Sequence, residues 1–167
     1  MKKPNLILVG PPGSGKGTFT QNLKKFGYVS LSTGNLLREL IKEGSSLGLE
    51  CKHFINEGSL VPDEIIFKII NERINFLFRG EKAFVLDGFP QSFVQYQYLL
   101  ELLRKEKKID EVCFLEFTIE NQKAVKRMTS RLFCSRCHYI YNKYKCPPLK
   151  NNICDKYKNY FSLPFKT

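Results

Sequence analysis

Apolar residues along the chain fall into short continuous runs and into longer stretches in which they recur at helical spacing. Runs that are apolar at almost every position are typical of strands buried on both faces of a parallel sheet. We predict four strands, over residues 6–9, 28–31, 83–86 and 112–117. Helical spacing predicts helices over residues 15–26, 33–41, 44–58, 62–74, 95–104 and 120–132. This alternation predicts an α/β fold, an open parallel sheet with helices on both faces, with Ser32 or Thr33 capping the second helix.

The rhythm of strands and helices breaks in the last third of the chain. Residues 134–160 are rich in Cys, Tyr, Lys, Asn and Pro and show no helical period, so we predict a loop-rich module there. Four of the six cysteines lie between Cys134 and Cys154. In a reducing compartment such a cluster favours metal binding over disulfides.

Composition limits the function classes without choosing one. With 167 residues, 43% apolar and 26% charged, the chain suits one main domain with a hydrophobic core. The net charge of +11 fits nucleic acid, an anionic surface, nucleotides or solvated helix faces, and the scattered lysines favour the last. The apolar run at residues 6–9 is too short for a signal peptide or a membrane span. We therefore expect a cytoplasmic protein without membrane association.

The segment between the first strand and the first helix has the pattern of a phosphate-binding loop. Residues 10–18 are GPPGSGKGT, which contains the spacing GxxxxGK and a threonine shortly after the lysine. Glycines let the backbone wrap around phosphates, the helix N-terminus attracts negative charge, and Lys16 adds a cation for the β- and γ-phosphates. A glycine-rich turn with a chance lysine is the alternative. The predicted ATP-binding residues of the loop are Gly13, Ser14, Gly15, Lys16, Gly17 and Thr18, with the Thr18 hydroxyl offered to Mg²⁺.

Three further motifs follow in an order and spacing that resemble the adenylate kinase family. They are STGNLLR at residues 32–38, GSLVPD at 58–63 and DGFP at 87–90. The resemblance covers residues 5 to about 157 and implies a P-loop NTPase-like fold with a helical AMP-binding insertion and a small lid. It implies reversible transfer of the terminal phosphate of ATP to AMP, giving two ADP for adenine nucleotide homeostasis, with Mg²⁺ as cofactor. The partners it implies are ATP, AMP and ADP, bound by a monomer.

The resemblance divides the chain into four parts. These are a core of residues 1–31 and 59–132, an AMP-binding segment of residues 32–58, a lid of residues 133–160 and a tail of residues 161–167. The AMP-binding residues that it implies are Thr33, Arg38, Ser59, Leu60, Val61, Gly88, Phe89, Pro90, Gln91 and Gln95. Among them, Arg38 would hold the α-phosphate and Gln95 would read the base edge.

In-line phosphoryl transfer needs positioning and charge neutralisation more than acid–base chemistry. The implied catalytic residues are Lys16, Arg127 and Arg131, the two arginines lying four apart on one face of a predicted helix at the base of the lid. A basic helix end near the negative pole of the macrodipole is the alternative for this pair. Asp87, at the end of a predicted strand, would hold Mg²⁺ through water, with a capping role as its alternative.

Cys134, Cys137 and Cys154 resemble three of the four ligands of the zinc-bearing lid found in part of the family. Tyr157 stands at the fourth position and is a poor zinc ligand. The spacing does not choose among Asp155, His138 and Cys146 as substitutes. A structural zinc site and a decayed site with free thiols therefore both stay open. Within the lid, Ile140 and Tyr141 pack either on the ATP adenine or in the lid's own core.

Three departures from the family pattern bear on activity. Gln91 stands where the resemblance expects an arginine, and Asn35 where it expects an acid. The chain also ends at Thr167, before a helix with two more active-site arginines, a strand and a closing helix that the resemblance implies. A second hypothesis is therefore a truncated nucleotide binder with weak or no turnover. A third, a basic zinc-ribbon nucleic-acid binder, is disfavoured by the ordered kinase motifs.

Overall fold

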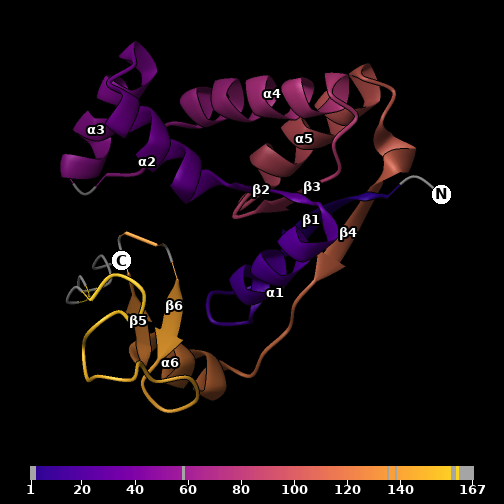
Figure 1. The fold of residues 1–167 in the computed structure, drawn as a ribbon. Helices are drawn as coiled ribbons and strands as arrows, with labels where there is room; N and C mark the ends of the chain where they lie inside the picture. Colours follow the sequence, from indigo (N-terminus) through magenta and orange to yellow (C-terminus); the bar gives the residue numbers. More distant parts are fainter. Residues whose placement is uncertain (1–2, 58, 135, 138, 159–160, 162–167) are drawn as a thin grey trace. The chain divides into compact units, whose positions relative to one another are not determined.

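A computed structural model describes residues 3–57, 59–134, 136–137, 139–158 and 161 of the chain (Figure 1). Its contacts divide the chain into two compact units. The first unit consists of Met1–Gly10 and Phe19–Phe117, and the second of Pro11–Thr18 and Thr118–Thr167. The subdivision of the chain into core, AMP-binding segment, lid and tail stays a prediction, and most of the tail lies outside the described residues.

The first unit is built on a parallel sheet of four strands. These are β1 (Asn5–Val9), β2 (Val29–Ser32), β3 (Phe84–Asp87) and β4 (Val112–Glu116), in the order β2-β3-β1-β4. Leu6 pairs with Val85 of β3 and with Cys113 of β4, so β1 lies between these two strands. The four predicted strands and the open parallel sheet are confirmed, with each strand shifted by at most one residue at either end.

Successive residues of each strand point to opposite faces of the sheet, and both faces are covered by helices. On one face, Leu6, Leu8 and Val85 pack against Phe19 and Leu23 of α1 (Lys16–Leu23). On the other, Ile7 and Leu86 belong to a larger cluster with buried isoleucines of α4 (Asp63–Arg79) and leucines of α5 (Phe93–Lys105). Figure 1 shows α4 and α5 on the side of the sheet opposite α1. This three-layer arrangement buries most side chains of the two central strands, β1 and β3, whereas those of β4 are half-buried or exposed.

Two shorter helices complete the first unit. They are α2 (Thr33–Glu43) and α3 (Ser46–Asn56), which pack against each other. Ser45 caps α3, since its hydroxyl accepts a hydrogen bond from the Gly48 N–H at 3.1 Å. Ser32 occupies the N-cap position of α2, but its side chain makes no capping hydrogen bond there. The predicted N-cap position is therefore confirmed for Ser32, without a capping hydrogen bond from its hydroxyl.

The second unit contains α6 (Asn121–Thr129) and an antiparallel hairpin of β5 (Arg131–Phe133) and β6 (Ile140–Asn142). We predicted helix up to residue 132, and this was wrong because the helix ends at Thr129. The hydroxyls of Thr129 and Ser130 bond back to carbonyls of the last turn, with Ser130 Oγ 2.6 Å from Lys126 O. Arg131 then pairs with Asn142, so that it lies on a strand and not on the helical face of Arg127.

Two single turns of 3₁₀ helix lie in the first unit, η1 (Lys24–Phe26) after α1 and η2 (Ile109–Glu111) before β4. Gly27 ends η1 with a φ of 79°. Among the described residues, the structure contains no helix whose length and apolar character would let it cross a membrane.

Candidate active site

The phosphate-binding loop leads directly into the N-terminus of α1. The helix begins at Lys16, so the end of the helix dipole that attracts anions lies directly after the loop. Lys16 Nζ donates to Pro11 O at 3.0 Å, and Ser14 N lies 3.3 Å from the same carbonyl. The loop therefore folds over its own start and brings the lysine ammonium to its rim.

Glycine is required where the loop begins. Gly10 has a φ of 138°, and a Cβ at this position would lie 2.2 Å from Phe117 O, which is too close for any side chain. Gly15, with a φ of 112°, precedes the helix and has open space around its Cα. The backbone next to Lys16 is therefore bare on the side where a phosphate group would approach.

Two side chains of the second unit present polar groups at the loop: Ser14, within it, and Arg127, on α6. Ser14 Oγ is buried and has no hydrogen-bond partner among the described residues, as expected for a group that bonds to a ligand. Arg127 Nη1 donates to Gly13 O at 3.2 Å, so its guanidinium lies against the loop. Arg131 is exposed on β5. The structure places Arg127 at the loop, while Arg131 reaches the second unit's surface from a different element.

A cavity of about 540 Å³ in the first unit is lined by residues from α2, α3, α4, α5 and the segments between them. Eight of the ten residues predicted to bind AMP line it: Thr33, Ser59, Leu60, Val61, Gly88, Phe89, Gln91 and Gln95. Arg38 is not among the lining residues, but its Nη1 lies 3.4 Å from the place of a Cβ on Gly34, which does line the cavity. Pro90, joined to Phe89 by a cis peptide bond, is likewise outside the lining.

Hydrogen bonds fix the floor of this cavity around Gly88. The Gly88 carbonyl accepts from Thr33 Oγ1 at 3.1 Å and from Gln91 Nε2 at 2.9 Å. Gly88 directly follows Asp87, the last residue of β3, so the carboxyl end of this strand leads into the cavity. Brought together by the fold, the three motifs that are distant in sequence form one concave surface.

Asp63 is a lining residue that the sequence reasoning did not assign to the AMP site. It is the first residue of α4, and its Oδ1 accepts a hydrogen bond from Gln95 Nε2 at 2.6 Å. Leu37, Ile55 and Ile66 also line the cavity. The only sequence signal for Asp63 was its place at the end of the GSLVPD motif.

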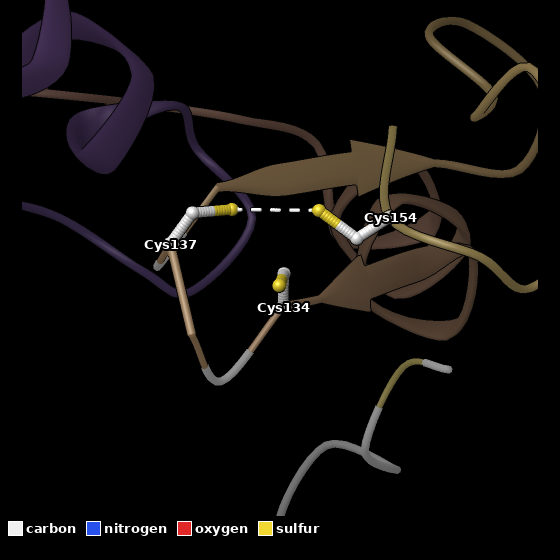
Figure 2. A group of neighbouring side chains, drawn as sticks. All are labelled: Cys134, Cys137 and Cys154. Carbon is white, nitrogen blue, oxygen red and sulfur yellow. Dashed lines mark hydrogen bonds between the residues drawn. The ribbon is translucent and has the colours of Figure 1, made fainter. Parts of the chain in front are cut away.

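The second unit also holds the cysteine cluster of Figure 2. The Sγ atoms of Cys134, Cys137 and Cys154 all lie within 4.8 Å of one another, with Cys137 and Cys154 3.6 Å apart. Cys134 and Cys154 are buried and pack with Tyr141, which is also buried. The three predicted zinc ligands therefore converge on one point.

Burial and neighbouring groups shift the pKa values of the Cys137 and Cys154 thiols in opposite directions. Burial raises the pKa of the Cys137 thiol to about 11. Burial also acts to raise the pKa of Cys154, but hydrogen bonds from the backbone of Tyr157 and Lys156, with those from Cys134 and the Tyr141 hydroxyl, lower it to about 6. Burial raises the pKa of Tyr141 to about 12, which keeps this hydroxyl a donor to sulfur.

Three thiols at these separations fit a tetrahedral zinc ion, which prefers four thiolate, imidazole or carboxylate ligands. No other His, Cys, Asp or Glu among the described residues joins the cluster. Asp155 accepts a hydrogen bond from Leu149 N at 2.8 Å, and Cys146 lies 3.9 Å from the Tyr139 hydroxyl. His138 lies outside the described residues, as does the side chain of Ile140. Tyr141, buried against Cys134 and Cys154, favours the lid-core role over contact with adenine.

Comparison with known proteins adds to this geometry. The family model for adenylate kinase matches residues 8–161. The chain is 41% identical over 154 residues to an adenylate kinase of Archaeoglobus fulgidus, covering 91% of this chain and 70% of that protein. It is 42% identical over 153 residues to an adenylate kinase of Methanosarcina acetivorans, covering 90% and 69% of the two chains. These matches cover most of the chain and agree with the phosphate-binding loop and with the cavity that Gly88 and Phe89 of the DGFP motif line. The chain therefore belongs to the adenylate kinase family.

Proposed function

We propose that this chain transfers the terminal phosphate of ATP to AMP, reversibly, giving two ADP. The observation that carries the proposal is the convergence of eight residues predicted to bind AMP on one cavity of about 540 Å³, a volume that suits a nucleoside monophosphate. A phosphate-binding loop alone would suit many nucleotide-binding proteins. The additional cavity, built from motifs characteristic of this family, favours a monophosphate acceptor.

Each proposed residue role follows from charge and position. Lys16 lies on the phosphate-binding loop, and Arg127 contacts the loop through Gly13 O. Both side chains neutralise charge on the phosphates of ATP. Arg131 is proposed to add a second guanidinium from β5, and Arg38 to hold the phosphate of AMP. No covalent intermediate is needed, because in-line transfer depends on positioning and electrostatic stabilisation.

Mg²⁺ bound with ATP supplies charge neutralisation on the phosphate oxygens, and Thr18 and Asp87 are its proposed protein contacts. Thr18 lies in the first turn of α1, and Asp87 ends β3. Both positions suit an oxygen donor to a hard cation. We also infer from the family resemblance that the protein acts as a monomer in the cytoplasm, which sedimentation and cell fractionation would test.

A coupled assay of ADP formation from ATP, AMP and Mg²⁺ by the purified chain tests the proposal. We expect turnover that requires all three components and runs in both directions. ATP binding without ADP formation would favour the second candidate, a nucleotide binder without turnover. The exposed, neutral Gln91 at the AMP cavity is the observation that keeps this candidate in view.

We propose further that Cys134, Cys137 and Cys154 hold a structural zinc ion. The support is their mutual distance below 4.8 Å together with the burial of two of the three. The hydroxyl of Tyr141, 3.7 Å from Cys154 Sγ, and the backbone N–H of Asp155, which donates to that hydroxyl at 3.1 Å, form an outer layer around the cluster. Such outer contacts orient the ligands of metal sites.

Zinc analysis of the purified chain should give about one ion per molecule, because the site has room for a single tetrahedral centre. Cys154→Ser should lose this zinc and lower the melting temperature, since metal binding contributes folding free energy. Cys113→Ser, a change at an exposed thiol on β4, is the matched control and should retain the zinc. Equal zinc contents in the two variants would rule out the proposed ligand set.

A further inference from the structure

The side-chain amide of Gln95 in the AMP cavity is held by a hydrogen-bond acceptor at its nitrogen and by a hydrogen-bond donor at its oxygen. Gln95 Nε2 donates to Asp63 Oδ1 at 2.6 Å, and Gln95 Oε1 accepts from the backbone N–H of Gln91 at 2.8 Å. All three residues line the cavity. Asp63 begins α4 and Gln95 lies in the first turn of α5, so two helices of the first unit hold this arrangement.

These partners allow only one orientation of the amide. An ionised carboxylate can only accept hydrogen bonds, and a backbone N–H can only donate one. If the amide turned over, its oxygen would face the carboxylate of Asp63 and its NH₂ group would face the N–H of Gln91. Both contacts would be repulsive. The backbone N–H at position 91 would be present with almost any residue there. The carboxylate of Asp63 is therefore the partner that depends on the identity of a side chain.

The orientation of this amide matters for recognition of a purine. The Watson–Crick edge of adenine presents an amino donor beside the N1 acceptor, whereas guanine presents the O6 acceptor beside the N1–H donor. An amide with a fixed orientation matches one of these two orders, and an amide that can turn over matches both. A site built to satisfy specific hydrogen bonds rejects a ligand that leaves its polar groups unpaired.

We propose that Asp63 is a positioning residue for base selectivity, which fixes the Gln95 amide in the orientation that suits adenine and not guanine. This inference rests on the proposed function of the cavity as the acceptor site. Asp63 need not touch the base. It acts through Gln95, with one Nε2 hydrogen and one Oε1 lone pair of that amide left for the ligand.

The test is equilibrium titration of AMP and GMP into the unmodified chain and into Asp63→Asn, a readout that needs no turnover. An asparagine can donate or accept, so the side chain at position 63 no longer opposes the turned amide and only the backbone N–H of Gln91 still does. We therefore expect a partial loss of selectivity, in which the ratio of GMP to AMP dissociation constants falls about fivefold. Glu64→Gln is the matched control, because it removes the same charge from the next, exposed residue in the first turn of α4. It should leave the ratio unchanged.

The ratio of GMP to AMP dissociation constants distinguishes a positioning role of Asp63 from a merely structural one. A structural role for Asp63 would weaken AMP and GMP equally and leave their ratio unchanged, which would overturn the inference. In a Gln95→Leu background, Asp63→Asn should change the ratio no further, because the amide through which it acts is gone. If the unmodified chain binds both monophosphates equally, the inference fails while ADP formation can stand. If it binds neither, the proposed function fails and the inference with it.

Discussion

Replacing Lys16 with alanine is expected to lower the rate of ADP formation roughly 10³-fold. The ammonium of Lys16 lies at the rim of the phosphate-binding loop, 3.0 Å from Pro11 O. Removing it takes away a positive charge placed where negative charge gathers on the transferring phosphoryl group. The coupled ADP assay measures the loss in turnover, and an equilibrium titration with ATP measures the accompanying loss in affinity.

The fold should survive this change. Lys16 is only partly buried at the first position of α1, and alanine is a better helix former than lysine. The melting temperature of Lys16→Ala should therefore equal that of the unmodified chain. Lys24→Ala, which removes the same charge from an exposed site on η1, directly after α1, is the control and should keep its activity. Similar losses in both variants would contradict a specific role for Lys16.

The sequence predicted the sheet well because continuous apolar runs have few other uses in a chain of this size. Residues 6–9 and 83–86 are apolar at every position, and only a strand covered on both faces buries such a run. The same local information placed the phosphate-binding loop, since all its parts are consecutive in sequence. For the four strands, the local pattern of apolar residues was therefore sufficient.

Arg131 shows what local information misses. No glycine or proline interrupts residues 120–132, so the pattern predicted one continuous helix. The helix ends because Ser130 finds partners far away in the sequence: its Oγ accepts from Asn142 Nδ2 at 2.8 Å, and its carbonyl accepts from Lys143 N at 2.8 Å. Pairing with β6 then overrides the helical preference of the segment. Tertiary contacts of this kind leave no trace in the periodicity.

The hydrogen bond between Asp63 and Gln95 was missed for a related reason. The two residues are 32 positions apart, and each taken alone is an unremarkable polar residue near the start of a helix. Only the packing of α4 against α5 brings their side chains together. The cysteine cluster could be predicted from the sequence, because three cysteines at the spacing of the family's zinc-bearing lid indicate one common site. One carboxylate and one amide far apart in the sequence carry no such pattern.

Replacing Gln91 with arginine is expected to tighten AMP binding roughly tenfold. Gln91 lines the cavity, and its side chain already bonds to the Gly88 carbonyl at 2.9 Å, so a longer side chain at this position can reach a ligand in the same space. A guanidinium forms charge-assisted, bidentate hydrogen bonds to a phosphate. A hydrogen bond of this kind contributes about 1.5–3 kcal/mol to the binding free energy, more than a bond from a neutral amide. The side chain is exposed, so solvent screening favours the lower end of this range.

The nature of the gain identifies the group that Gln91 faces. The improvement should be present for AMP, absent for adenosine, and reduced by added salt, because only the phosphate carries charge. Gln91→Lys should give a smaller improvement, since an ammonium lacks the planar pair of donors. Neither substitution alters the backbone N–H of residue 91, so the orientation of Gln95 is kept. An equal gain for adenosine would show that residue 91 does not lie at the phosphate end of the cavity.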